Sequence, residues 1–475
     1  MPGQVAIVHG WSDTSKSFHD LGDFLVANGY DTKQIWLTDY VSIDDDVRIE
    51  DVAKRMHAVL QGAVAAGQLT VPFDMIVHST GGLVAREWIS RHFPNGIDSP
   101  VKRLVMLAPA NFGSRLASLG KSMLGRVIKG WNNWFQSGTE MLAALELASS
   151  YQWDLARRDL LDPIGNGSGP YGHNKVWPFV IVGSRGYSSG LRAVVNEGGS
   201  DGTVRAAAAN LNAIGLTIDF SVNPANPSVT PWRRRTDVQF PFAILPDRDH
   251  STIHQPGSPS GATDEISGQL GKLILDALRC DTAAGYSTLA AAWDRISEAT
   301  SQLSLDSNSL TQAFQGTQPN IEVLHQYMQV VVFMRDDQGQ PVDDYFLEFF
   351  SPEQAGNDDA VYFHRKVLDD VHVNGQSASR RCFFVDRTDL MGGFYPLIAD
   401  PVKRQVAVSL SAAEIGPNIR YFDSSRTGAK GYLIIHREAD DRRTALGPAC
   451  LWRNTTHLAE IVIPRQPINK VFALS

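Results

Sequence analysis

Cysteine is scarce in this chain of 475 residues, since only Cys280, Cys382 and Cys450 occur. Their number and spacing form neither a disulfide framework nor a zinc site, so buried thiols in a reducing compartment are expected. No apolar run approaches the roughly 18 residues that a membrane span needs. The first residues, Met1–Val8, lack the basic leader and the apolar core of a signal peptide. The sequence therefore predicts cytoplasmic synthesis, with membrane contact at most peripheral.

An excess of basic residues is also missing. The 43 lysines and arginines against 51 aspartates and glutamates leave a net charge of −8. This gives no sign of a nucleic-acid binder, because phosphate neutralisation needs a basic surface. The short run Arg233–Arg235 could meet anionic headgroups, but a solvated loop is the favoured interpretation. Glycine-rich nucleotide loops and the common metal-binding motifs are absent from the sequence, so neither a metal nor an organic cofactor is expected.

The composition is that of a globular protein, and the length predicts two or three domains. Several unbroken apolar runs suit the strands of a parallel sheet that is covered on both faces. The runs are Val5–Val8, Met75–Val77, Leu104–Leu107, Phe179–Val182 and Phe242–Leu245. Helix-like stretches follow the first runs, at about 15–28, 48–66 and 81–92. This alternation predicts an α/β fold with a mostly parallel sheet and helices on both faces.

Other parts of the chain differ in texture. Helical spacing and many aromatic residues over about 112–175 predict a helical cap, inserted into an α/β catalytic domain of residues 1–300. The stretch 301–320 is rich in Ser, Gln and Asn and is expected to be a linker. Residues 321–475 are expected to form a β-rich domain of the sandwich type. The strands expected there are 330–333, 345–350, 361–363, 382–385, 406–408, 432–435 and 460–463.

Catalytic chemistry is indicated where the strand Met75–Val77 runs into His-Ser-Thr-Gly-Gly and a helix follows. A serine on such a strand-to-helix turn presents its hydroxyl at the carboxyl edge of the sheet. The usual motif has glycine two positions before the serine, where this chain has Val77. Ser79 could instead be only the N-cap of the helix. We interpret Ser79 as a nucleophile and expect the neighbouring His78 to point into packing.

A serine that attacks an acyl group creates a negative oxygen, so hydrogen-bond donors must already point at that oxygen. The backbone N–H of Thr80, directly after the serine, is one candidate. The backbone N–H of Trp11 is the other, because His9-Gly10-Trp11 ends the first strand, where this architecture completes an oxyanion hole. A simple chain turn at His9-Gly10 is the alternative.

A serine nucleophile also needs a histidine base and an acid that orients it, and in this fold the acid precedes the histidine in the sequence. Asp201 is the candidate acid, with an ordinary Asp-Gly turn as the alternative. His250, just past the last strand, is the candidate base, and His254 stays open as a second one. Asp247 and Asp249 either stabilise the turn or compete with Asp201 for the imidazole.

These motifs make the chain resemble the α/β-hydrolases, and more narrowly the bacterial PlaB family of phospholipases A and lysophospholipases A. The resemblance is carried by His-Gly-Trp-Ser at 9–12, His-Ser-Thr-Gly-Gly at 78–82 and Arg-Glu-Trp at 86–88, and by the size and texture of the C-terminal part. It implies hydrolysis of phospholipid and lysophospholipid acyl esters through a Ser-His-Asp acyl-enzyme mechanism. It also implies peripheral membrane association and self-association, as a dimer or tetramer.

The cap is expected to supply an apolar cleft for the acyl chain, since each buried methylene contributes about 0.8 kcal/mol. Its candidate residues are Met123, Val127, Trp131 and Trp134, and ordinary core packing explains them equally well. Two other functions stay open. The same triad would serve a general esterase, a thioesterase or an acyltransferase, and the scaffold could be a non-catalytic binding protein. The β-rich domain is a candidate for membrane docking or subunit contact.

Overall fold

The computed structural model describes residues 3–8, 18–35, 46–117, 138–165, 167–187, 196–257, 269–302, 325–352, 358–413, 415–421, 432–441 and 451–467. The chain divides into two compact units. The first comprises Met1–Leu160, Asn166–Asn212 and Arg234–His325, and the second comprises Leu161–Gly165, Ala213–Arg233 and Gln326–Ser475. The second unit thus takes a segment from the middle of the range that the sequence analysis assigns to the catalytic domain.

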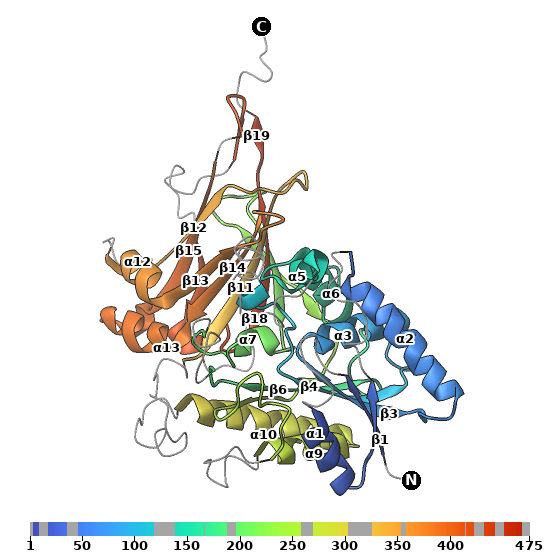
Figure 1. Ribbon diagram of the computed structural model, residues 1–475. Helices are drawn as coiled ribbons and strands as arrows, with labels where there is room; N and C mark the ends of the chain where they lie inside the picture. Colours follow the sequence, from blue (N-terminus) through green and yellow to red (C-terminus); the bar gives the residue numbers. More distant parts are fainter. Residues whose placement is uncertain are drawn as a thin grey trace, which may run out of the picture. The chain divides into compact units, whose positions relative to one another are not determined.

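The first unit is built on a parallel sheet of six strands in the order β10-β6-β4-β3-β1-β2 (Figure 1). The strands are β1 (Gln4–Val8), β2 (Asp31–Ile35), β3 (Phe73–His78), β4 (Val101–Leu107), β6 (Trp177–Gly183) and β10 (Phe242–Leu245). Every residue of β3 and β6 is buried, as expected for strands covered on both faces. All five predicted apolar runs lie in this sheet, and the predicted α/β fold is confirmed.

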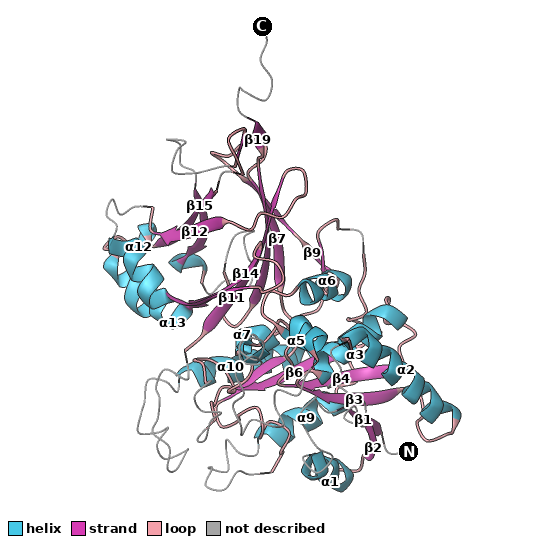
Figure 2. Ribbon diagram, turned by 45° about the horizontal axis from the view of Figure 1, so that its top comes forward, coloured by secondary structure: helices cyan, strands magenta, loops and turns pink. Residues whose placement is uncertain are grey.

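Helices cover both faces of this sheet, with α1, α9 and α10 on one side and α2 and α3 on the other (Figures 1 and 2). The helices of this unit are α1 (His19–Ala27), α2 (Ile49–Ala65), α3 (Gly81–His92), α5 (Thr139–Leu145), α6 (Ser150–Asp159), α7 (Ala206–Ala209), α9 (Gln269–Arg279) and α10 (Ala283–Gln302). In α2 the buried residues Val52, Met56 and Leu60 recur every four positions, which places one apolar stripe against the sheet. Throughout the described part of the chain, helices are too short or too polar to cross a membrane.

The second unit contains two larger sheets. A mixed sheet has the order β13-β14-β11-β18-β7-β8, and an antiparallel sheet has the order β12-β15-β17. The strands are β7 (Ile214–Asp219), β8 (Ser228–Pro231), β11 (Tyr327–Asp336), β12 (Tyr345–Phe350), β13 (Leu368–Val373), β14 (Arg380–Asp386), β15 (Gln405–Ala412), β17 (Tyr432–Arg437) and β18 (Thr456–Ile463). The shortest strands are β5 (Leu161–Asp162), β9 (Arg233–Arg234), β16 (Ile419–Arg420) and β19 (Gln466–Pro467).

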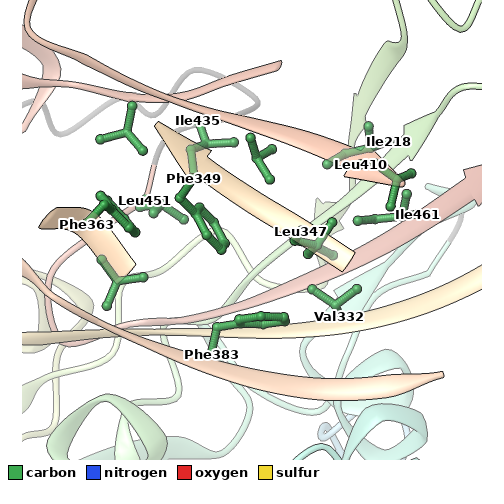
Figure 3. Close-up of a cluster of buried hydrophobic side chains, with 14 of the residues drawn as sticks. Ile218, Val332, Leu347, Phe349, Phe363, Phe383, Leu410, Ile435, Leu451 and Ile461 are labelled. Atoms are coloured by element: carbon green, nitrogen blue, oxygen red, sulfur yellow. The ribbon is translucent and has the colours of Figure 1, made fainter. Parts of the chain in front are cut away.

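One apolar cluster lies between these two sheets (Figure 3). Strand β12 shows how a strand contributes to this cluster, because Tyr345, Leu347 and Phe349 are buried while Phe346 and Glu348 between them are exposed. This alternation is typical of a strand with one face toward a core. The β-rich character predicted for the C-terminal part is therefore confirmed, and β7 adds an inward face to the same core from a distant part of the sequence.

The prediction of a strand at 361–363 is wrong, because those residues are helical. They end α12 (Asp358–Tyr362) and begin the π-helix η5 (Phe363–Val367). Phe363 and Val367 are both fully buried one helical turn apart, and three apolar residues in a row do not distinguish strand from helix. The other short helices of this unit are α13 (Arg387–Asp389), η6 (Leu390–Phe394), η7 (Tyr395–Leu397), η8 (Pro401–Lys403) and η10 (Glu438–Asp440).

A buried histidine, His457 of β18, is held in its neutral form inside this unit. Its Nε2 accepts a hydrogen bond from the Trp452 N–H at 2.8 Å, and its Nδ1–H donates to the Gln329 carbonyl at 3.1 Å. Burial lowers the pKa of His457 to about 4. In an unfolded chain the histidine pKa is about 6.5. The unfolded chain therefore binds more protons than the folded unit between these two values.

We expect the second unit to lose about 2 kcal/mol of its free energy of unfolding when the pH falls from 7.5 to 5.0, because stability rises with pH wherever the unfolded state binds more protons. Hydrogen exchange of the β11 and β18 amides, measured by mass spectrometry, would follow this loss. His457→Gln keeps an acceptor for Trp452 and does not titrate, so its pH dependence should be flatter. An equally steep dependence in that variant would assign the effect to other groups.

Candidate active site

Ser79 occupies the turn between β3 and α3, at the carboxyl edge of the parallel sheet. Its φ of +53° is in the left-handed region, which residues with a side chain rarely adopt. Its N–H donates to the Leu107 carbonyl of β4 at 3.0 Å. A Cβ on Gly82 would lie 2.7 Å from the Pro109 Cβ, so α3 packs this closely only because glycine is there. A sharp turn of this kind is where serine nucleophiles are exposed, so Ser79 stays the candidate nucleophile.

Three side chains from distant parts of the sequence meet beside this turn. His250 Nε2 lies 3.0 Å from Ser79 Oγ, and His250 Nδ1 lies 2.8 Å from Asp201 Oδ2. Asp201 is fully buried and His250 nearly so. If Nδ1 carries the proton, it donates to the carboxylate and leaves the Nε2 lone pair facing the hydroxyl. Such an arrangement can take a proton from serine and stabilise the imidazolium that forms.

The carboxylate of Asp201, the candidate acid, is oriented by its own loop. Asp201 Oδ1 accepts the N–H groups of Thr203 at 3.0 Å and Val204 at 2.8 Å, which leaves Oδ2 for the imidazole. The Asp201 carbonyl also accepts the His250 N–H at 2.9 Å. The Asp-Gly turn considered as an alternative is present as well, since Gly202 has a φ of +92°. The turn after Asp201 therefore supplies the N–H groups that hold its carboxylate.

The loop that carries His250 lies against the end of β6. A Cβ on Gly183 would lie 1.9 Å from the Arg248 carbonyl oxygen, and the Arg185 N–H donates to that oxygen at 3.1 Å. Any larger residue than glycine at position 183 would displace the backbone two residues before His250. The end of β6 thus sets the height of the histidine above the sheet.

The other candidates from the sequence have different contacts. Asp249 Oδ1 accepts the N–H groups of the two residues after His250, at 2.9 Å each, so this side chain stabilises the turn. Asp247 Oδ2 lies 3.2 Å from the Arg248 Nε. The ring of His254 stacks on Phe18, with ring centroids 4.5 Å apart.

The candidate oxyanion and cleft residues are only partly described. Thr80 follows Ser79 as the N-cap residue of α3 and is buried, at a helix terminus whose N–H groups favour negative charge. The remaining predicted residues, Trp11, Met123, Val127, Trp131 and Trp134, lie outside the described residues. The second oxyanion donor and the acyl cleft therefore stay predictions.

Arg86, from the Arg-Glu-Trp motif, is buried on α3 and pairs with Asp159 of α6. Two parallel hydrogen bonds join them, from Nε at 2.9 Å and from Nη2 at 3.0 Å. Nη1 donates to the Asn111 carbonyl, in the loop after β4, at 3.1 Å. Burial acts to lower the pKa of Arg86, but Asp159 opposes it and leaves the pKa above its ordinary value. Arg86 of this motif thus joins α3, the helix after the serine turn, to α6 and to the loop after β4.

His78 has a contact that sequence reasoning missed. Its ring packs against Phe18 and His250, at centroid distances of 5.7 and 4.8 Å, which agrees with the predicted packing. Its Nε2 also lies 3.1 Å from the His250 carbonyl oxygen. The two residues are 172 positions apart in the sequence, so no local pattern could indicate this contact.

Metal-ligating side chains do not gather in the described part of the first unit. No three histidine, cysteine or carboxylate groups belonging to it bring ligand atoms within 4.8 Å of one another. The hydrogen-bonded serine, histidine and aspartate are the groups with evident chemistry at this edge of the sheet.

The parallel sheet, the serine turn and the order of strands and helices define an α/β-hydrolase fold, as predicted. Over its full length the chain is similar to the solved structure of phospholipase PlaB from Legionella pneumophila, with 24% sequence identity and a TM-score of 0.76. The match covers 100% of this chain and 96% of that one. The structure of PlaB in complex with thio-NAD gives 24% identity, coverages of 99% and 96%, and a TM-score of 0.75.

No protein-family model and no curated protein matches the sequence. At 24% identity the likeness to PlaB establishes the fold. The predicted resemblance to PlaB is confirmed at that level, including the β-rich C-terminal part.

Proposed function

We propose that this chain is a serine ester hydrolase acting on lipids, as a phospholipase A and lysophospholipase A. The observation that carries the proposal is the series of hydrogen bonds from Asp201 through His250 to Ser79, with the serine on a left-handed turn. The full-length likeness to a protein named as a phospholipase supports lipid esters as the substrate class.

In this mechanism Ser79 Oγ attacks the acyl carbonyl carbon while His250 Nε2 takes the hydroxyl proton. Asp201 accepts the Nδ1–H, keeps the imidazole in the right tautomer and stabilises its charged form. The N–H groups of Thr80 and Trp11 are assigned to the oxyanion. His250 then gives its proton to the leaving glycerol oxygen, the ester C–O bond breaks, and the acyl group stays on Ser79.

A water molecule completes the cycle. His250 takes one of its protons as it attacks the acyl-enzyme carbonyl, and the fatty acid leaves when the proton returns to Ser79 Oγ. Met123, Val127, Trp131 and Trp134 are assigned to the acyl cleft, where apolar area stabilises a long chain. Peripheral membrane association and self-association belong to the same proposal, with the β-rich part as the candidate docking surface. Neither metal nor organic cofactor is needed for these steps.

The test combines labelling with product analysis on the purified full-length chain. A fluorophosphonate probe is expected to modify Ser79, identified by peptide mass spectrometry, and Ser79→Ala should abolish the modification. Ser287→Ala, at an exposed position on α10, is the matched control and should be labelled like the wild type. Vesicles of phosphatidylcholine and micelles of lysophosphatidylcholine should yield free fatty acid.

Each alternative has its own result. No labelling of the folded wild type would indicate a non-catalytic binding protein. Labelling with a rate on p-nitrophenyl esters that falls as the acyl chain lengthens would indicate a short-chain esterase. Acyl groups transferred to an added alcohol or thiol in preference to water would indicate an acyltransferase. Sedimentation with the same vesicles tests the membrane association.

A further inference from the structure

His78 lies at the junction between the nucleophile and the base. It is the last residue of β3, directly before Ser79, and its side chain is 2% exposed. The ring Nε2 lies 3.1 Å from the carbonyl oxygen of His250. A carbonyl can only accept a hydrogen bond, so Nε2 must carry the hydrogen and donate it. The strand that leads into the nucleophile therefore binds the backbone of the loop that carries the base.

The backbone of His250 is held from two sides. Its N–H donates to the Asp201 carbonyl at 2.9 Å, and its own carbonyl accepts from His78. The two ring nitrogens of His250 are hydrogen-bonded as well, which fixes the direction of the ring. The backbone contacts then set how far Nε2 lies from the Ser79 hydroxyl. Removing the contact from His78 would leave a buried carbonyl without that donor and free one side of the loop.

Packing fixes the plane of the His78 ring. Phe18 lies against it at a centroid distance of 5.7 Å, and His254 lies at a centroid distance of 5.4 Å with an angle of 64° between the rings. The ring of His250 is 4.8 Å away and tilted by 43°. With neighbours on these sides, the ring cannot turn freely, so its donor stays aimed at one oxygen.

We propose that His78 is a positioning residue, which acts through His250 by holding its carbonyl and thereby setting the distance from Nε2 to the Ser79 hydroxyl. The inference rests on the proposed function, because it has meaning only if Ser79 reacts. Small displacements of a reacting group are costly, since a misplacement of about 1 Å can lower a rate by about 100-fold. The effect should fall on kcat, because His78 is buried and its Nε2 is aimed at the His250 backbone.

Two substitutions at position 78 separate the effect of the hydrogen-bond donor from the effect of the aromatic ring. His78→Phe keeps an aromatic ring but removes the donor, and His78→Gln removes the ring but keeps an amide N–H at nearly the position of Nε2. We expect His78→Phe to lower kcat by about 10- to 100-fold with KM changed less than about twofold. His78→Gln should keep kcat within about fivefold of the wild type. The rate of fluorophosphonate labelling at Ser79 should follow the same order.

The opposite order, with His78→Phe more active than His78→Gln, would assign the residue to packing and overturn the inference. Equal losses in both variants, or no loss in either, would overturn it as well. Melting temperatures show whether each variant folds. If His78→Phe does not fold, His78→Asn serves instead, because its amide stops short of the carbonyl and should behave like the phenylalanine. A wild type without labelling would instead reject the proposed function.

Discussion

Replacing Asp201 with asparagine is expected to lower kcat by about 10,000-fold while leaving the fold intact. The reason lies in how the carboxylate is used. Its Oδ1 accepts two backbone N–H groups, from Thr203 and Val204. The asparagine must therefore keep its oxygen there and turn its NH2 group toward His250. An NH2 group facing Nδ1 forces the proton onto Nε2, and that nitrogen then cannot take the proton of Ser79.

The matched control is Asp249→Asn, in the loop of the base itself. Asp249 Oδ1 accepts the N–H groups of Ser251 and Thr252, and asparagine keeps an oxygen for both. Its kcat should stay within about threefold of the wild type, since the turn is preserved. Steady-state rates on one lipid ester and melting curves for both variants make the comparison. A small effect at 201 with a large one at 249 would move the acid role to the other carboxylate.

Among the changes considered, removing the buried cation at position 86 should lower the free energy of unfolding most. Arg86→Met is expected to lower the free energy of unfolding by about 3 to 5 kcal/mol, because it leaves the Asp159 carboxylate buried and without its cationic partner. Both side chains of the pair have an exposed fraction of 0%. Guanidinium unfolding of the full chain, followed by far-ultraviolet circular dichroism, would measure the change.

Two further variants identify the cause of that loss. Arg91→Met makes the same chemical change on the same helix, but its side chain is 52% exposed, and its buried partner Glu87 keeps Arg158 and the Tyr151 hydroxyl. It should therefore cost less than about 1 kcal/mol. Arg86→Met combined with Asp159→Leu removes both charges and should recover more than half of the loss. If the double variant is as unstable as Arg86→Met alone, lost packing rather than the unpaired carboxylate explains the effect.

Much of the first unit could be predicted, because a strand covered on both faces is apolar at every position. The runs at Val5–Val8 and Phe179–Val182 show this without any knowledge of their neighbours. The order of the strands could not be predicted in the same way. Strand β1 lies between β2 and β3, and nothing in its composition distinguishes these partners from β4 or β6.

The second unit shows where pattern alone fails. Strands β7 and β8 lie in the range predicted for the catalytic domain, yet β7 pairs with β18. Thr217 Oγ1 donates to Glu460 Oε2 at 3.1 Å, between residues 243 positions apart. The pattern of residues 361–363 was equally ambiguous, because a short apolar run serves a strand or a buried helix. Pairing over such distances is decided by the core that the strands share.

The candidate site divides in the same way. The serine turn, the acid and the histidine were predictable as residues, since a strand end followed by a helix and the chain order of the fold are features of the sequence. The choice between His250 and His254 was not, because they are four positions apart in one loop. The close approach of the Arg248 carbonyl to Gly183 sets which of them reaches Ser79.

By itself, the sequence determined which segments are apolar enough to be buried strands and which residues are candidates for a hydrolytic site, because hydrophobicity and side-chain type belong to each residue. Only the tertiary structure decided the strand partners, the distances among Ser79, His250 and Asp201, and the contact between His78 and the His250 carbonyl. Those properties depend on which distant segments pack together, and packing is a property of the whole chain.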